Sequence, residues 1–190
     1  MNSKTKIQNL VLASVFAALI LAMTFIPYTG YIMYAPAGIE ITTLHIVTIL
    51  GASLLGWKYG AVLGGVWGLA CILRAATNPL WADFMNPMIS LLPRIAVGLV
   101  AGLLFMALKK TRLPMFVSVG IVAAAGTVTN TVLVLTMYNF FGGGITQGVF
   151  DLLGSIFSTL IAVNGTIELV AAIVLVPLLY NAVTKATKKS

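Results

Sequence analysis

MISLLPRIAVGLVAGLLFMALKKTRLPMFVSVGIVAAAGTVTNTVLVLTMY (residues 88–138) contains two long apolar runs that are separated by a short basic gap. Each run is long enough for a membrane-crossing helix, which needs about 20 residues. The gap holds Lys109, Lys110 and Arg112. Two apolar runs around a cluster of cations are typical of two membrane helices joined by a cytoplasmic loop. This stretch therefore predicts an integral membrane protein.

The same pattern continues in both directions along the chain. Lysine and arginine gather before the first apolar run, between the second and third, between the fourth and fifth, and after the sixth, whereas the other gaps carry only Glu40, Asp83 and Asp151. This alternation predicts an all-α integral membrane fold of six transmembrane helices, with the N and C termini in the cytoplasm. The predicted spans are Ile7–Ile26, Thr42–Leu55, Tyr59–Ala76, Met88–Leu108, Pro114–Tyr138 and Ile156–Tyr180.

The composition agrees with this interpretation, because 60% of the residues are hydrophobic and only 8% are charged, against roughly 25% charged in soluble proteins. We expect one transmembrane domain over residues 1–190. The second apolar run is short, so we expect it to be tilted, to be partly interfacial, or to begin earlier, around Ile39. The net charge of +7 lies at the ends of spans rather than along one stripe, which argues against binding to nucleic acid.

Two segments on the predicted outer side are longer than tight turns. Pro27–Glu40 is rich in tyrosine and proline, and Asn139–Asp151 contains the flexible triplet Gly142-Gly143-Gly144. Both are candidates for lids over a binding site. An aromatic belt at the membrane interface together with a loose loop explains them equally well.

Small residues recur at helical spacing, and helices carrying such ridges approach one another closely. The glycine ridges are predicted to pack inside the protein. In the first span, Ala13 and Ala17 lie one turn apart, with Ser14, Ala18 and Ala22 on the adjoining face. The glycines are Gly60, Gly64 and Gly68 in the third span and Gly98 and Gly102 in the fourth.

Arg74 and Arg94 are cations within apolar sequence, and both map to the outer side of the membrane. Ionisable residues inside a membrane are costly and indicate functional sites. Two guanidinium groups at similar depth suggest an anion site, because a guanidinium can hold a carboxylate with two parallel hydrogen bonds. The alternative is that Arg94 pairs with Glu168 while Arg74 reaches outward to Asp83.

Other polar residues at a similar depth extend the candidate site. Glu168 lies near the middle of the sixth span, and Asn164 is one turn away on the same face. Amide, hydroxyl and imidazole groups of this kind could bind the hydroxyls and amides of a small solute. The same side chains also serve as hydrogen-bonding contacts between helices. The remaining candidates are Thr127 and Asn130 in the fifth span and His45 in the second.

Patterns of catalysis and metal binding do not occur in the sequence. The single histidine excludes a site built from several histidines, and the lone Cys71 has no partner for a disulfide. Neither a nucleophile elbow nor a phosphate-binding loop is present. We therefore expect no catalytic residues, no metal site and no cofactor in this chain.

Taken together, these residues resemble the S components, the substrate-specificity subunits of energy-coupling-factor (ECF) vitamin transporters. The resemblance covers nearly the whole chain. It includes the pattern Ala13-Ser14-Val15-Phe16-Ala17, the stretch from Thr43-Leu44-His45-Ile46 to Gly51, and Gly56-Trp57-Lys58-Tyr59-Gly60. The last of these, with Gly64-Gly65 and Arg74 beyond it, is most similar to pantothenate-type members.

The resemblance implies a multi-pass protein of the bacterial plasma membrane that is not an enzyme. It would bind one vitamin from outside and dock on a transmembrane coupling protein that carries two cytoplasmic ATPases. ATP and magnesium would be bound by those partners, and a toppling motion would carry the loaded site inward. The alanine motif of the family faces the coupling protein, which implies docking through Ala13 and Ala17.

An acidic vitamin fits the two arginines, so pantothenate is the expected ligand, with its one carboxylate, two hydroxyls and amide. Pyridoxine, a hydroxymethylpyrimidine, riboflavin or folate are the alternatives within the family. Outside it, a proton-coupled carrier using Glu168 and a non-transporting scaffold subunit also remain open.

Overall fold

The structure is a computed structural model that describes residues 3–33, 40–142 and 145–188. Side chains are described at all of these residues except 3–5, 33, 80, 145–162 and 188. Within these residues the chain forms six α-helices, one short 3-10 helix and two short strands. The parts of the two expected lids at 34–39 and 143–144 lie outside the described residues. The helices are α1 (Ser3–Phe25), α2 (Leu44–Leu55), α3 (Trp57–Ala75), α4 (Pro87–Leu108), α5 (Met115–Phe141) and α6 (Ile145–Lys188), with η1 (Pro79–Met85), β1 (Tyr31–Met33) and β2 (Glu40–Thr42).

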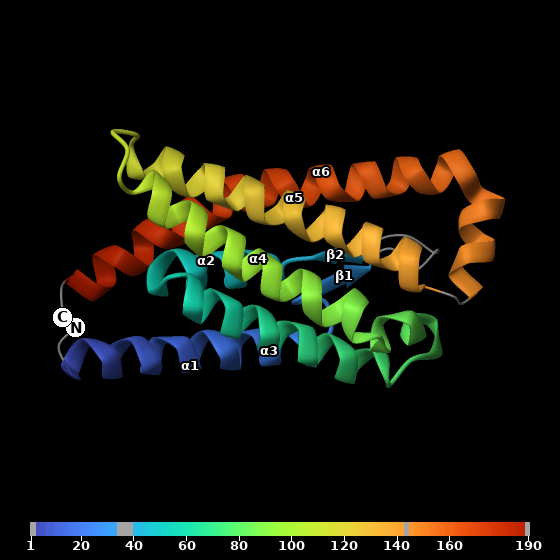
Figure 1. The fold of residues 1–190 in the computed structure, drawn as a ribbon, viewed down its shortest axis with the longest axis horizontal. Helices are drawn as coiled ribbons and strands as arrows, with labels where there is room; N and C mark the ends of the chain where they lie inside the picture. Colours follow the sequence, from blue (N-terminus) through green and yellow to red (C-terminus); the bar gives the residue numbers. More distant parts are fainter. Residues whose placement is uncertain (1–2, 34–39, 143–144, 189–190) are drawn as a thin grey trace.

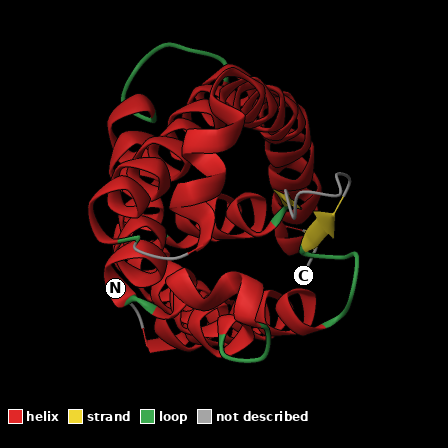
Figure 2. Cartoon of the chain, turned by 90° about the vertical axis from the view of Figure 1, so that its right-hand side faces the viewer, coloured by secondary structure: helices red, strands yellow, loops and turns green. Residues whose placement is uncertain are grey.

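The helices run along the long axis of the molecule, so the bundle has two distinct ends (Figure 1). Both termini, the α2–α3 turn and the α4–α5 connection lie at one end, which we call the termini end. The opposite end holds η1 and the start of α6, and we call it the η1 end. Figure 2, viewed from the η1 end, shows the helices nearly end-on with the strands at one side. The basic gaps of the sequence therefore gather at the termini end, as predicted; they contribute Lys6, Lys58, Lys109, Lys110, Arg112 and Lys185.

Four helices in the described part of the chain are long and apolar enough to cross a membrane, namely Lys6–Phe25, Pro87–Leu108, Met115–Phe141 and Val163–Thr187. The short second run, α2, is apolar but has only 12 residues. It packs against α1, α3, α4, α5 and α6, and its residues 44–53 are all buried. The expected tilted or interfacial helix is thus an internal helix that its neighbours surround.

Local sequence signals set several of these boundaries. Asn86 caps α4, because its side-chain oxygen accepts a hydrogen bond from the Met88 amide at 3.0 Å. Pro87 follows in the first turn, where its missing N–H costs nothing. Between α2 and α3 a single residue makes the turn, and that residue is Gly56 at φ +94°, a conformation that glycine adopts without strain.

Helices α3 and α4 approach each other backbone to backbone along the two glycine ridges. A methyl group on Gly60 would lie 2.5 Å from the Gly98 carbonyl oxygen. A methyl group on Gly64 would overlap the Arg94 carbonyl oxygen. Equally close approaches occur at the other glycines of the ridges, Gly68 and Gly102. The prediction of internal packing is therefore confirmed, and the seam fixes the backbone of Arg94 against α3.

Two features differ from the sequence expectation. Strands β1 and β2 were not expected; they pair antiparallel with Tyr31 opposite Thr42. The expected loop over 139–151 is wrong for most of its length, since α5 continues to Phe141 and α6 begins at Ile145. No proline follows the glycine triplet there, and the apolar residues of 145–153 support a helix. The first turns of α6 cross the η1 end before the helix runs back along the bundle (Figure 1).

The seam gives a matched pair of substitutions. We expect Gly64→Ala to lower the thermal stability of the detergent-solubilised protein, by an amount on the order of 1–3 kcal/mol, since the new methyl group has no space. Gly65→Ala is the control, because a methyl group there would meet only the Ile95 side chain, at 3.9 Å. Thermal unfolding followed by tryptophan fluorescence measures both. Equal effects of the two substitutions would contradict a backbone seam at Gly64.

Candidate functional site

Five polar side chains meet at one level of the bundle. Gly126 of α5 lies against Ile49 of α2 and Val97 of α4, since a methyl group on it would be 2.6 Å from Ile49 and 3.8 Å from Val97. One turn further towards the η1 end, the same three helices carry Asn130, His45 and Arg94. Helix α6 reaches this level at Gly165, which faces Thr131. We call His45, Arg94, Asn130, Asn164 and Glu168 the polar layer; all were predicted site residues.

Several atoms of the polar layer are buried without a hydrogen-bond partner. Among the described side chains, such atoms occur only in His45, Arg94, Asn130 and Asn164. They are both ring nitrogens of His45, Nε of Arg94 and the Oδ1 atoms of the two asparagines. Buried polar atoms are almost always paired in folded proteins. Four residues with such atoms lie at one level of the bundle.

Among these residues Arg94 matters most, because its side chain carries a charge. Its residue is only 5% exposed, and its guanidinium carbon lies 5.2 Å from the centre of the Trp67 ring. One amino group donates to the Ile89 carbonyl oxygen at 2.7 Å. The described residues place no carboxylate within 4.0 Å of it. The direct ion pair with Glu168, the expected alternative, is therefore not formed, and Glu168 attracts the guanidinium charge only from beyond contact distance.

The residue before Arg94 explains how its side chain is held. Pro93 lies inside α4 and has no N–H, so the Ile89 carbonyl oxygen one turn earlier loses its usual backbone donor. The Arg94 guanidinium takes that place. The proline thus creates the acceptor that orients the arginine, and this Pro-Arg pair is a signal that the sequence analysis missed.

Glu168 and Asn164 hold strand β2 on α6. A Glu168 carboxylate oxygen accepts a hydrogen bond from the Thr42 amide at 2.7 Å. The Asn164 side-chain amide donates to the Glu40 carbonyl oxygen at 3.1 Å. His45, at the start of α2, lies beside the backbone of Thr42 and Glu168. Two of the predicted ligand residues therefore also fasten the segment that follows the first helix.

Arg74 lies outside the polar layer, at the end of α3, and holds β2 from the other side. It makes an ion pair with Glu40 at 2.7 Å, so the expected alternative contact with Asp83 is wrong. Asp83 instead accepts a hydrogen bond from the Tyr138 hydroxyl at 2.8 Å. The Arg74 guanidinium also lies over the Tyr31 ring, 4.1 Å from its centre. The sequence offered no signal that favours Glu40 as the partner, since each outer gap carries a single acidic residue.

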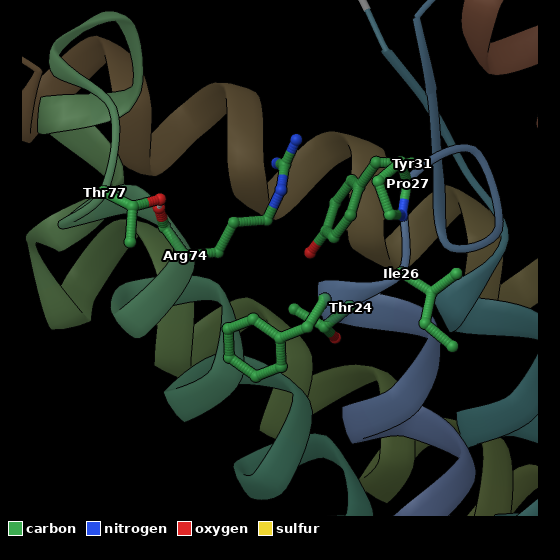
Figure 3. Close-up of a pocket in the computed structure, with 7 residues that line it drawn as sticks. Thr24, Ile26, Pro27, Tyr31, Arg74 and Thr77 are labelled. Atoms are coloured by element: carbon green, nitrogen blue, oxygen red, sulfur yellow. Dashed lines mark hydrogen bonds between the residues drawn. The ribbon is translucent and has the colours of Figure 1, made fainter.

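A cavity of about 250 Å³ opens beside this ion pair (Figure 3). The Arg74 and Tyr31 side chains lie next to each other there. Burial raises the pKa of the Tyr31 phenol above its usual value, so the hydroxyl stays neutral and accepts a hydrogen bond from Trp67 Nε1 at 3.2 Å. None of the four residues with unpartnered atoms belongs to the lining, which consists of Thr24, Phe25, Ile26, Pro27, Tyr31, Arg74 and Thr77.

Thr127 lies one turn from Asn130 towards the termini end, but its hydroxyl makes a hydrogen bond within its own helix. The hydroxyl donates to the Ala123 carbonyl oxygen at 2.9 Å, which leaves only its oxygen lone pairs for a ligand. Thr127 is buried near the polar layer. Its hydroxyl hydrogen is already donated within the helix and is not available to a ligand.

The predicted docking residues lie on the side of α1 that faces the rest of the bundle. Ala13 is buried and Ala17 is half-buried. The small residues of α1 that are exposed are Ser14, Ala18 and Ala22, the adjoining ridge that the sequence analysis also noted.

Comparison with known proteins places this geometry in a family. Residues 8–180 match the family described as ECF transporter, substrate-specific component. The "Pantothenic acid transporter PanT" of Lactococcus lactis subsp. cremoris is 32% identical, over 98% of this chain and 99% of that protein. The "Pantothenate transporter PanT" of Leuconostoc mesenteroides subsp. mesenteroides is 29% identical, over 100% of this chain and 97% of that protein. The family match covers most of the chain, and both relatives align along their full length. The chain therefore belongs to the substrate-specific components, or S components, of ECF transporters, which are transport subunits rather than enzymes.

Proposed function

We propose that this S component binds pantothenate with high affinity, with the vitamin carboxylate on Arg94 and its hydroxyls and amide on the remaining polar layer. The observation that carries the proposal is the buried Arg94 guanidinium that no carboxylate of the described residues contacts directly. A buried charge that lacks a partner costs several kcal/mol, so its retention is best explained by a ligand that brings the opposite charge. Both named relatives are pantothenate transporters.

The remaining unpartnered atoms suit the rest of the vitamin. The Oδ1 atoms of Asn130 and Asn164 can accept hydrogen bonds from the two vitamin hydroxyls. His45, when neutral, offers one donor and one acceptor, which matches an amide. Thr127 can add an acceptor. This set has no second free cation at the same level, which favours a ligand with one carboxylate over folate with two.

The segment Pro27–Glu40 is the lid in this proposal. Its described end, β2, is held by Arg74, Asn164 and Glu168. A vitamin that enters from the η1 end has to pass β2, and these polar contacts then open and close with each exchange. Arg74 acts at the rim, where its ion pair with Glu40 keeps the lid in place.

The orientation and the partners follow from the distribution of charge and from the family. The basic termini end faces the cytoplasm of the bacterial plasma membrane under the positive-inside rule, so the η1 end faces outward and six spans traverse the bilayer. Residues 1–190 act as one transmembrane domain. The chain binds no cofactor or metal of its own; a coupling protein and two cytoplasmic ATPases that bind ATP and magnesium drive release.

Docking on the coupling protein occurs through α1. The family motif assigns the contact to Ala13 and Ala17, whose small side chains allow another helix to come close. Because Ala13 is buried and Ala17 is half-buried in this structure, the contact requires the partner helix to come close to the surface of α1.

Isothermal titration with a panel of vitamins tests the assignment of Arg94. We expect tight binding of pantothenate, and a loss of at least about tenfold in affinity for Arg94→Gln, since a hydrogen bond to a charged group contributes roughly 1.5–3 kcal/mol. Because Arg94→Gln also removes an uncompensated buried charge, it should not lower the melting temperature of the vitamin-free protein.

The matched control is Arg112→Gln, which removes a guanidinium at the termini end and should leave affinity unchanged. Pantothenate binding by Arg94→Gln that equals wild-type binding would remove Arg94 from the site. Tight binding of another vitamin alone would keep the family and refute the anion assignment.

The lid contacts predict a kinetic effect. Glu40→Gln abolishes the ion pair with Arg74, so we expect bound pantothenate to dissociate roughly three- to tenfold faster, as suits a partly exposed ion pair. A chase of radiolabelled pantothenate with unlabelled vitamin measures the rate. Asp83→Asn serves as the control, because Asp83 is a carboxylate at the same end that accepts a hydrogen bond from Tyr138 of α5. Equal acceleration in both variants would argue against a lid fastened by Glu40.

Docking is tested by adding bulk to α1. We expect Ala17→Leu to prevent copurification with the coupling protein and the ATPases while the isolated subunit keeps its affinity for pantothenate. Ala18→Leu, on the exposed ridge, is the comparison. Loss of assembly with Ala18→Leu alone would move the contact to the ridge of Ser14, Ala18 and Ala22. Loss of vitamin binding with Ala17→Leu would mean that the packing of Ala17 against the hydrophobic core is needed for binding, and it would contradict a role in docking alone.

A further inference from the structure

A second groove, far from the polar layer, lies between α1 and α3 at the termini end. It has a volume of about 450 Å³ and is lined by Lys6, Leu10, Lys58, Tyr59 and Val62. The two lysines come from different helices and flank an apolar floor. The proposed function uses none of these residues.

Among the side chains that the structure describes, no acidic one forms an ion pair with the lysines of the groove. The chain has four acidic residues. Glu40 and Asp83 belong to elements towards the η1 end, Glu168 lies in the polar layer, and Asp151 belongs to the first turns of α6. In the described part of the chain the one ion pair joins Arg74 and Glu40. The Lys6 and Lys58 ammonium groups are therefore available to an anion from outside the chain.

The floor of the groove is apolar and continues along the outside of the bundle. Leu10 and Val62 are each 61% exposed. Further along α3, Leu69 and Leu73 are exposed as well. Tyr59 belongs to the lining, and the Lys58 ammonium lies 5.5 Å from the centre of the neighbouring Trp57 ring. Such aromatic side chains favour the level of lipid headgroups. An occupant thus needs an anionic head and a long apolar tail.

We propose that this groove binds one anionic phospholipid of the leaflet at the termini end. The phosphate lies between the Lys6 and Lys58 ammonium groups, where the Tyr59 hydroxyl can donate a further hydrogen bond. One acyl chain follows Leu10 and Val62 along the cleft between α1 and α3. A lipid fits better than an acidic protein segment, because the groove opens on the side of helices that face the bilayer and its floor offers no polar partner for a peptide backbone.

Native mass spectrometry of the detergent-solubilised protein tests this site with two lipids of identical acyl chains, phosphatidylglycerol and phosphatidylcholine. We expect wild-type protein to retain one phosphatidylglycerol in preference to phosphatidylcholine. The double variant Lys6→Gln, Lys58→Gln should lose that preference by on the order of tenfold. The double variant Lys109→Gln, Lys110→Gln removes the same charge from the same end outside the groove and should keep it. Melting temperatures of all three proteins show that they are folded.

Three outcomes would overturn the proposal. The first is equal retention of the two lipids by the wild-type protein. The second is an equal loss in the groove variant and its control, which would mean a general effect of net charge. The third is displacement of phosphatidylglycerol by inorganic phosphate alone, which would make the groove an anion site that does not recognise lipid. A groove variant that keeps its lipid but fails to assemble with the coupling protein would assign the groove to that partner instead.

Discussion

The interior of a bilayer offers no water, so every polar group placed there has to find its partner within the protein or in a ligand. Most of this chain obeys that constraint through its helices and through hydroxyls that bond to their own backbone, as Thr127 does. The polar layer departs from it. Four of its residues keep buried atoms without a partner, and one of them carries a full charge. Such an arrangement is unstable by itself and becomes reasonable once a polar solute completes it.

Two local devices hold Arg94 in this position. The glycine seam presses the α4 backbone at Arg94 against Gly64 of α3, and Pro93 leaves the Ile89 carbonyl oxygen free to accept from the guanidinium. Backbone and side chain are therefore both fixed before any ligand arrives. A preorganised group loses little freedom on binding, which raises affinity. The strand β2 adds a third element, since its contacts with α3 and α6 close the approach to the layer.

Much of this could be predicted from the sequence, because a membrane imposes strong patterns. The run lengths located all six helices, and the basic gaps correctly identified one common end. The glycine ridges were correctly assigned to internal packing. Residue type alone selected His45, Arg94, Asn130 and Asn164 as site candidates, and the structure brings them to one level; their role in binding stays a prediction.

The remaining features depend on contacts that no local pattern records. Strands of three residues such as β2 have little preference of their own, and this one is fastened by Asn164 and Glu168 from more than a hundred residues away. The partner of Arg74 could not be chosen between acidic residues of different gaps. The rotation of α1 was equally open, since Ala13 and Ala17 lie beside a second ridge of small residues.

The backbone seam has a consequence for evolution. Gly60, Gly64 and Gly98 touch no ligand, yet a side chain at any of them would push apart the helices that carry Arg94. A change of cargo would act on side chains such as Asn130, whereas these glycines are constrained whatever the cargo is. Invariance of the glycines among homologues would therefore reflect the helix packing of this protein rather than its specificity.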